Sequence, residues 1–123
     1  MATSDAAAEA ILVLTTTADD ESAVALSRTL VEEGLAACVT RTPVRSVFRW
    51  EATASGEPGR SPRDMRVCDE AEVLLLIKTA RARLAELERR ILELHSYDCP
   101  EILVIAPEHA GAKYLAWLLA ACG

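Results

Sequence analysis

Apolar residues in this chain recur with a period that switches between that of strands and that of helices. Residues 11–14 are four aliphatic residues followed by three threonines, which predicts a buried strand. Residues 17–20 (Thr17, Ala18, Asp19, Asp20) then have the form of a capping box, with acidic groups at the positive end of a helix. We expect that helix to run to about Glu33 and to end at Gly34.

Two long extended segments come next. Residues 36–50 contain apolar and β-branched residues interrupted by Pro43, which predicts an edge strand with a bulge or bend at the proline. Residues 65–79 return as a second strand, and the aliphatic run at 73–77 indicates burial on both sheet faces. Residues 51–64, rich in glycine, proline and polar groups, are interpreted as an exposed hairpin loop.

The rest of the chain repeats the pattern of helix and strand. Thr79 is a candidate cap for a helix over about 81–94, with an apolar face at Leu84, Leu87, Ile91 and Leu94. Residues 102–105 predict a last strand and residues 113–121 a short terminal helix. The resulting order is βαββαβ, which predicts an α+β ferredoxin-like sandwich with both helices on one face of an antiparallel sheet. We expect a disordered tail at 1–9 and a single domain over 10–123.

The central hairpin is unusually long. Each arm spans about 14 residues, whereas strands usually have about 5 or 6. A two-stranded ribbon that projects beyond its sheet is at best marginally stable alone, and an open edge can pair with another chain. The element lengths therefore predict a closed homo-oligomer.

Composition argues against a nucleic-acid partner, a membrane span and secretion. The formal charge of the 123 residues is −6, with a pI near 4.9, which argues against nucleic acid because phosphate binding relies on clustered Lys and Arg. No stretch has the ~20 apolar residues of a membrane span, and the N-terminus lacks the basic region of a secretory signal. The four cysteines form no CxxC pair, which favours free thiols in a reducing cytoplasm.

The segment 95–101 carries the most chemistry. It places His95, Tyr97, Asp98, Cys99 and Glu101 within seven residues, between a predicted helix and a predicted strand. Connections between a helix and a strand usually carry few reactive side chains, so this segment is interpreted as part of a binding site.

Five blocks of sequence resemble the CutA divalent-cation-tolerance proteins in order and spacing. They are Leu35-Ala36-Ala37-Cys38-Val39, Ser46-Val47-Phe48-Arg49-Trp50-Glu51, Glu72-Val73-Leu74-Leu75-Leu76-Ile77-Lys78-Thr79, His95-Ser96-Tyr97-Asp98-Cys99-Pro100-Glu101 and Tyr114-Leu115-Ala116-Trp117. The resemblance implies a ferredoxin-like homotrimer, similar in build to the PII signalling proteins, whose hairpins pack on neighbouring subunits. It also implies a response to copper or other divalent cations and a polar cleft between subunits.

The chain departs from that family pattern in three places. Ser96 and Asp98 stand where the family usually has Pro and Glu, and Cys99 replaces a small or aliphatic residue. Ala52 replaces a glycine, and the hairpin turn is roughly ten residues longer than usual. The changes around Tyr97 and at Ala52 could alter ligand preference, whereas the longer turn is expected to leave the core intact.

Four residues are candidate ligands for a divalent metal such as Cu²⁺ or Zn²⁺. His95, Cys99 and Glu101 offer nitrogen, sulfur and oxygen donors, although Pro100 disfavours the helical geometry that would make His95 and Cys99 converge. The alternative for His95 is an imidazole that hydrogen-bonds a carbonyl at the helix end. Cys38 is a secondary candidate, and a small buried hydrophobe is its simpler role.

Five further residues are candidates for the ligand cleft. Trp50 and Tyr97 are amphipathic rings typical of pocket walls, with core packing as the alternative. Lys78 ends an apolar strand, either as a solvated charge or as a partner for an anion or for Glu101 across the cleft. Arg49 is either a surface charge or part of an intersubunit pair, and Asp98 lies beside Tyr97.

Three functions are consistent with these residues. The first is a metal-responsive or ligand-sensing trimer without catalysis, and the second is an assembly module whose trimer is itself the function. The third, a small hydrolase, has little support, because the acidic, glycine-free turn at 15–19 is unlike an anion nest and no catalytic triad can be set out.

Overall fold

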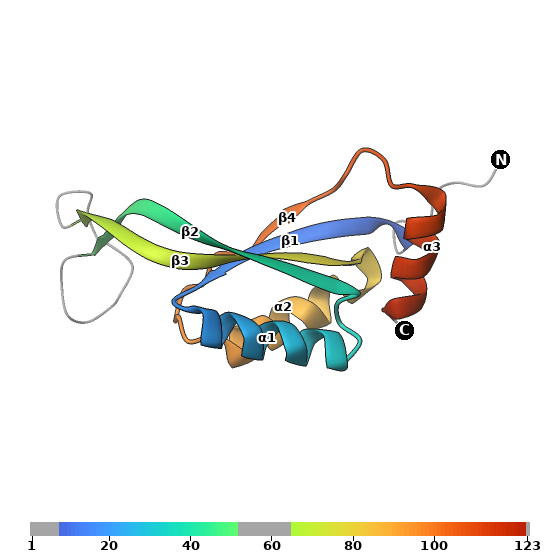
Figure 1. Cartoon of the computed structure of the whole chain (residues 1–123), viewed down its shortest axis with the longest axis horizontal. Coiled ribbons are helices and arrows are strands. Elements are labelled where there is room, and N and C mark those ends of the chain that lie inside the picture. The colour runs from blue at the N-terminus through green and yellow to red at the C-terminus, as the bar shows by residue number, and fades with distance from the viewer. Residues whose placement is uncertain (1–7, 52–64, 123) are drawn as a thin grey trace.

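The chain folds as a sheet with two helices packed on one face. The structure, a computed structural model, describes residues 8–51 and 65–122. Its elements in chain order are β1 (Ala10–Thr17), α1 (Asp20–Glu32), β2 (Cys38–Glu51), β3 (Met65–Ala80), the 3-10 turn η3 (Arg81–Arg83), α2 (Leu84–Leu94), β4 (Leu103–Ile105) and α3 (Ala112–Ala121). The sheet order is β2-β3-β1-β4, with antiparallel pairing throughout. The predicted α+β ferredoxin-like architecture is confirmed (Figure 1).

Strand alternation and helix periodicity bury one face of the sheet against α1 and α2. Alternate residues of β1 and β3 point toward the helices, and the inner faces of both helices meet them. The core comprises Ile11, Val13, Ala23, Leu26, Leu30, Leu35, Ala36, Val73, Leu75, Ile77, Leu87 and Ile91. Leu84 packs on this core as expected, but Leu94 is 39% exposed because α2 ends there.

The opposite face of the sheet is apolar but only partly covered. Its central side chains, Leu12, Leu14, Leu74 and Leu76, are half-buried, and Leu103 and Ile105 of the edge strand β4 are 56% and 46% exposed. Helix α3 covers only the end of the sheet, where Leu118 and Cys122 pack on Ala37 and Ala80 (Figure 1). The expectation that residues 73–77 are buried on both faces is therefore not met within a single chain.

The hairpin arms are as long as the sequence predicts. β2 has 14 residues and β3 has 16, and they pair from Cys38↔Lys78 to Glu51↔Met65. β1 pairs only with residues 73–80 of β3, so residues 44–51 and 65–72 extend past the sheet as a ribbon (Figure 1). At ~3.4 Å per residue this ribbon is roughly 27 Å long.

The start of α1 differs from the predicted capping box. Asp19 is the N-cap, because its carboxylate accepts the backbone N–H of Ser22 at 2.8 Å. Thr17 still belongs to β1, and its hydroxyl donates to the Asp19 carbonyl at 3.0 Å. The predicted stop at Gly34 is confirmed by its left-handed backbone, with φ of 73°.

Two other local predictions are wrong. Thr79 does not cap a helix, because it is the buried penultimate residue of β3 and its hydroxyl donates to the Leu35 carbonyl at 2.7 Å. Pro43 causes no bulge, since the β2–β3 register stays constant through Pro43↔Val73. The proline is tolerated because β2 is an edge strand, as expected.

The residue just before β1 contacts the turn that follows β3. The Arg81 backbone N–H donates to the Glu9 carbonyl at 2.9 Å, and its guanidinium pairs with the Glu9 carboxylate at 3.2 Å. Within the predicted tail, residues 1–7 lie outside the described residues, as do residues 52–64 of the predicted loop. No helix in residues 8–51 or 65–122 has the length and apolar character needed to cross a membrane.

Candidate functional site

His95 ends α2 and fastens the chain to the end of β1. Its backbone N–H donates to the Ile91 carbonyl at 2.8 Å, and its extended φ and ψ of −70° and 140° stop the helix. The ring Nε2 lies 2.7 Å from the Thr16 carbonyl, and Nδ1 lies 3.0 Å from the backbone nitrogen of Tyr97. A carbonyl only accepts and a backbone N–H only donates, so this network assigns the proton to Nε2.

Tyr97 connects the same segment to β3 at the point where the hairpin leaves the sheet. Its hydroxyl donates to the Glu72 carboxylate at 2.8 Å, and its ring lies 4.8 Å from that of His95. Burial raises the pKa of the Tyr97 phenol, and the hydrogen bond and charge of Glu72 raise it further. The pairing of β3 with β1 stops at Val73, so Glu72 is the adjacent residue of the projecting ribbon. Tyr97 therefore holds the point at which the hairpin leaves the sheet.

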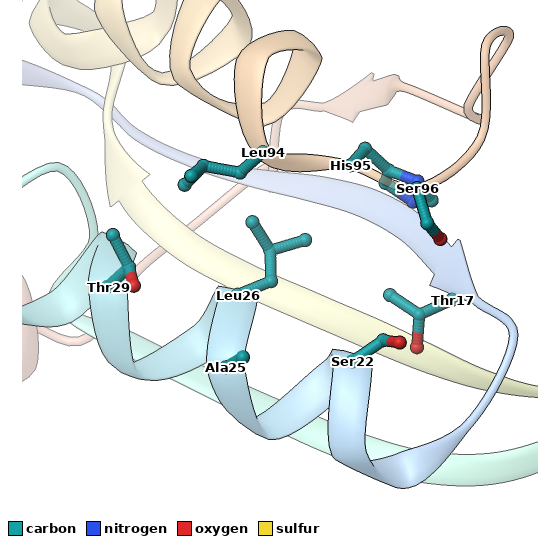
Figure 2. A pocket seen from close by; sticks show the side chains of 8 residues that line it. All are labelled: Thr17, Ser22, Ala25, Leu26, Thr29, Leu94, His95 and Ser96. Atoms are coloured by element: carbon teal, nitrogen blue, oxygen red, sulfur yellow. The ribbon is translucent and has the colours of Figure 1, made fainter.

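A pocket of about 240 Å³ lies beside His95, between the first turns of α1 and the end of α2. Figure 2 shows that side chains from these helices and from the end of β1 surround it. The lining mixes hydroxyl groups with aliphatic groups: Thr17, Ser22, Ala25, Leu26, Thr29, Leu94, His95 and Ser96. Of the residues singled out from sequence as metal or cleft candidates, only His95 lines it; the serines and threonines of α1 carry no sequence signal that separates them from ordinary helix residues.

The predicted metal ligands divide into two groups. Cys99 and Glu101 are exposed in the same connection as His95. Cys38 instead lies on β2 opposite Lys78, and Lys78 lies opposite Leu12 of β1. His95 bonds Thr16, which is four residues further along β1 than Leu12. Four residues of strand are ~13 Å, so Cys38 and His95 cannot bind one ion within a single chain.

The donors also do not gather within either group. Across residues 8–51 and 65–122, no three His, Cys, Asp or Glu side chains are arranged to hold a metal ion. Both nitrogens of His95 are already engaged. The described residues of one chain therefore do not by themselves fit a metal centre.

The predicted cleft residues are spread along the length of β3. Trp50 is opposite Arg66 on the ribbon and packs edge-on against Phe48 at 6.4 Å, with Arg49 beside it. Tyr97 reaches Glu72, with the exposed Asp98 adjacent, whereas Lys78 lies near the other end of β3. From position 66 to 72, and again from 72 to 78, is ~20 Å, so one chain does not form this cleft.

Lys78 has neighbours that the sequence did not indicate. Its ammonium donates to the Thr40 hydroxyl at 2.8 Å and lies 3.9 Å from the Cys38 sulfur. Cys38 is half-buried rather than fully buried. Pairing of Lys78 with Glu101 across a subunit cleft stays a prediction.

Comparison with known proteins places this geometry in a family. A family model described as CutA1 divalent ion tolerance protein matches residues 11–60 and 62–121. The chain is 36% identical over 108 residues to the divalent-cation tolerance protein CutA of Thermus thermophilus, covering 87% of this chain and 92% of that one. It is 33% identical over 109 residues to the chloroplastic protein CutA of Arabidopsis thaliana, covering 88% of this chain and 53% of that one.

Solved structures agree with this assignment. The structure of the periplasmic divalent cation tolerance protein CutA from Archaeoglobus fulgidus superimposes with a TM-score of 0.80 at 25% identity, covering 93% of this chain and 99% of that one. The residues matched by the family model span the sheet, both packed helices and the terminal helix, and they include the five sequence blocks. The chain therefore belongs to the CutA1 divalent ion tolerance protein family.

Proposed function

We propose that this chain is a non-catalytic divalent-cation tolerance protein that acts as a homotrimer and binds Cu²⁺ or Zn²⁺ at clefts between subunits. Its relatives carry the name of divalent-cation tolerance proteins and match most of its length. The trimer and the PII-like signalling architecture follow from the resemblance to CutA proteins. The four cysteines are all unpaired, which supports a cytoplasmic location, although the names of two relatives place them in the chloroplast and the periplasm.

The observation that carries the proposal is the apolar surface that one chain leaves uncovered. Leu103 and Ile105 on β4 are about half exposed, and the ribbon of β2 and β3 presents Val47 and Val67 at 68% and 72% exposure. Apolar edges and faces of this kind stabilise an assembly when a second copy covers them. A closed assembly also brings residues of one ribbon toward a different part of a neighbouring chain.

Such an assembly would complete the site that one chain leaves dispersed. His95, Cys99 and Glu101 lie at one connection, and further donors would come from a neighbouring subunit. For His95 to bind an ion, the metal must replace the bond to Thr16 or the bond from Tyr97, each worth about 1 kcal/mol. We therefore expect micromolar or weaker affinity.

The oligomeric state is tested by light scattering on wild type and two leucine variants. Wild type is expected to have three times the 13.3 kDa mass of one chain. Leu103→Lys places a charge on the exposed β4 edge and should lower that mass, whereas Leu92→Lys, at a leucine of similar exposure on α2, should not. A wild-type mass of 13.3 kDa at micromolar concentration would remove both the trimer and its cleft.

Metal binding is tested by calorimetric titration of metal-free protein with Cu²⁺ and Zn²⁺. His95→Gln should weaken binding at least tenfold, because it removes the proposed nitrogen donor. His109→Gln is the matched control, since His109 is the other histidine of the chain and is exposed in the segment between β4 and α3. No heat with either ion, or equal affinity in the His95 variant, would contradict the metal assignment.

A second candidate is a small-ligand sensor or an assembly module without metal. It is favoured by the structural use of both His95 nitrogens, which agrees with the simpler interpretation of that residue. If the protein is a ligand sensor, Tyr97→Ala would abolish the ligand response while metal titrations stay silent. If it is an assembly module, Tyr97→Ala and His95→Ala would leave the cellular phenotype intact, whereas breaking the trimer would not.

A further inference from the structure

Cys38, Thr40 and Lys78 form a cluster of a thiol, a hydroxyl and an amine at the base of the hairpin, here called the thiol–amine cluster. We propose that it is a site of oxidative modification, at which peroxide converts Cys38 and Lys78 into a covalent sulfur–nitrogen cross-link. This inference goes beyond the proposed function, because it requires no metal.

Sheet register brings the two reacting atoms together. Cys38 and Lys78 are directly opposite each other in antiparallel strands, so their side chains project from the same face. Lys78 Nζ lies 3.9 Å from Cys38 Sγ. Small side-chain rotations are enough to bring an amine at this distance into bonding contact with the sulfur, and no change of backbone register is needed.

Thr40 holds the amine in place. It follows Cys38 by two residues on β2 and therefore shares its face. Its Oγ1 accepts a hydrogen bond from Lys78 Nζ at 2.8 Å and lies 4.0 Å from the Cys38 sulfur. A lysine that would otherwise sample many rotamers is thereby kept beside the thiol.

The surroundings of Cys38 differ from those of the other cysteines. Reactive thiols occur in partly exposed, electropositive settings, whereas buried thiols are inert. Cys38 is half-exposed beside an ammonium, while Cys122 is buried against the Thr79 hydroxyl at 3.5 Å. Cys68 is also half-exposed but lies on the ribbon opposite Phe48, and Cys99 is exposed in the 95–101 connection.

The modification proceeds in two balanced steps. Hydrogen peroxide transfers one oxygen to Cys38 Sγ, so that an S–O bond forms as the O–O bond breaks; the thiol proton leaves with the second oxygen as water. The sulfur is oxidised by two electrons and the peroxide is reduced. Lys78 first releases one ammonium proton to solvent, and the free amine then attacks the sulfur, so that an S–N bond forms as the S–O bond breaks. A second nitrogen proton leaves with the hydroxyl as water.

The product would alter the base of the hairpin in two ways. It links the edge strand β2 covalently to β3 at their first residue pair, Cys38↔Lys78. It also removes the positive charge of Lys78 from the face that carries Leu12 and Leu76. Oxidation would therefore remove one positive charge and join β2 to β3 covalently.

The test is peptide mass spectrometry of metal-free, full-length protein before and after treatment with hydrogen peroxide. Wild type should yield a joined peptide pair containing Cys38 and Lys78, lighter than the two peptides by two hydrogen atoms. Lys78→Arg keeps the positive charge but should abolish the joined pair and leave a Cys38 sulfenic acid that dimedone traps. Thr40→Val should lower the yield several-fold, and Cys68→Ser, at a cysteine of similar exposure, should not change it.

Three results would overturn the proposal, of which the first two concern the wild-type protein. One is oxidation of wild-type Cys38 to sulfenic or sulfinic acid while Lys78 stays unmodified. The other is oxidation of Cys68 or Cys99 in preference to Cys38. A joined pair that persists in Lys78→Arg would likewise show that a different amine reacts.

Discussion

Removing the Tyr97 hydroxyl should loosen the point at which the hairpin leaves the sheet. Tyr97→Phe keeps the ring against His95 but deletes the 2.8 Å hydrogen bond to the Glu72 carboxylate. A hydrogen bond to a charged group contributes about 1.5–3 kcal/mol, and competition from water at these half-buried residues places the expected loss at about 1–2 kcal/mol.

Urea denaturation of wild type, Tyr97→Phe, Glu72→Gln and the double variant, at one fixed protein concentration, measures this bond. The double variant should be more stable than the sum of the two single losses predicts, with a coupling of about 1 kcal/mol, because either single change already breaks the interaction. Fixed concentration matters because assembly makes the apparent stability depend on it.

The pH dependence supplies an independent check. The pKa of Tyr97 is raised in the folded chain above its ordinary value of 10.0, so the folded state retains the phenol proton more strongly than the unfolded state. The stabilisation from Tyr97 is therefore complete below pH 10 and is lost as pH rises above it, by at most about 1.4 kcal/mol per pH unit. The stability gap between wild type and Tyr97→Phe should narrow above pH 10. Equal stability at pH 7 and no coupling with Glu72 would refute the role assigned to this bond.

Three further predictions test the fold. Leu87→Ala should cost about 3 kcal/mol in urea denaturation because Leu87 is fully buried, whereas Leu92→Ala, at a leucine 53% exposed on the same helix, should change stability by less than about 0.5 kcal/mol. Thr79→Val should cost about 1–3 kcal/mol by leaving the buried Leu35 carbonyl without its hydroxyl donor, and Thr79→Ser should restore most of it; equal losses would contradict this. The Ser22 backbone N–H lowers the pKa of Asp19 below 3.8, so the charge of this cap stabilises the fold above that pH and is lost as pH falls; Asp19→Asn should lack this dependence in an acid titration followed by circular dichroism.

Local signals were strongest where one residue type has a unique conformational role. Gly34 ends α1 as expected, because its left-handed backbone suits a residue without a Cβ atom. The start of the same helix was misplaced by two residues, since Thr17 and Asp19 can both cap and only the last β1 pair, Thr17↔Val73, decides between them. At Pro43, the sequence predicted tolerance on an edge strand correctly but not the unbroken register.

In the candidate site, the sequence identified single residues, whereas the structure identified their partners. The sequence identified His95 and Tyr97 as unusual residues in a short connection, but it did not identify their partners. Thr16 is 79 residues away from His95, and Glu72 is 25 residues away from Tyr97. Thr40 likewise emerged as a partner of Lys78, across 38 residues, only when β2 and β3 were paired.

The sequence by itself determined the order and approximate bounds of the elements, the long hairpin arms and the family, because alternating and helical periodicities are properties of neighbouring residues. Only the tertiary structure decided which side chains meet, because strand register and the packing of the 95–101 connection join residues far apart in the chain. It also showed that helices α1 and α2 both cover one face of the sheet, and that the predicted cleft residues are spread along β3.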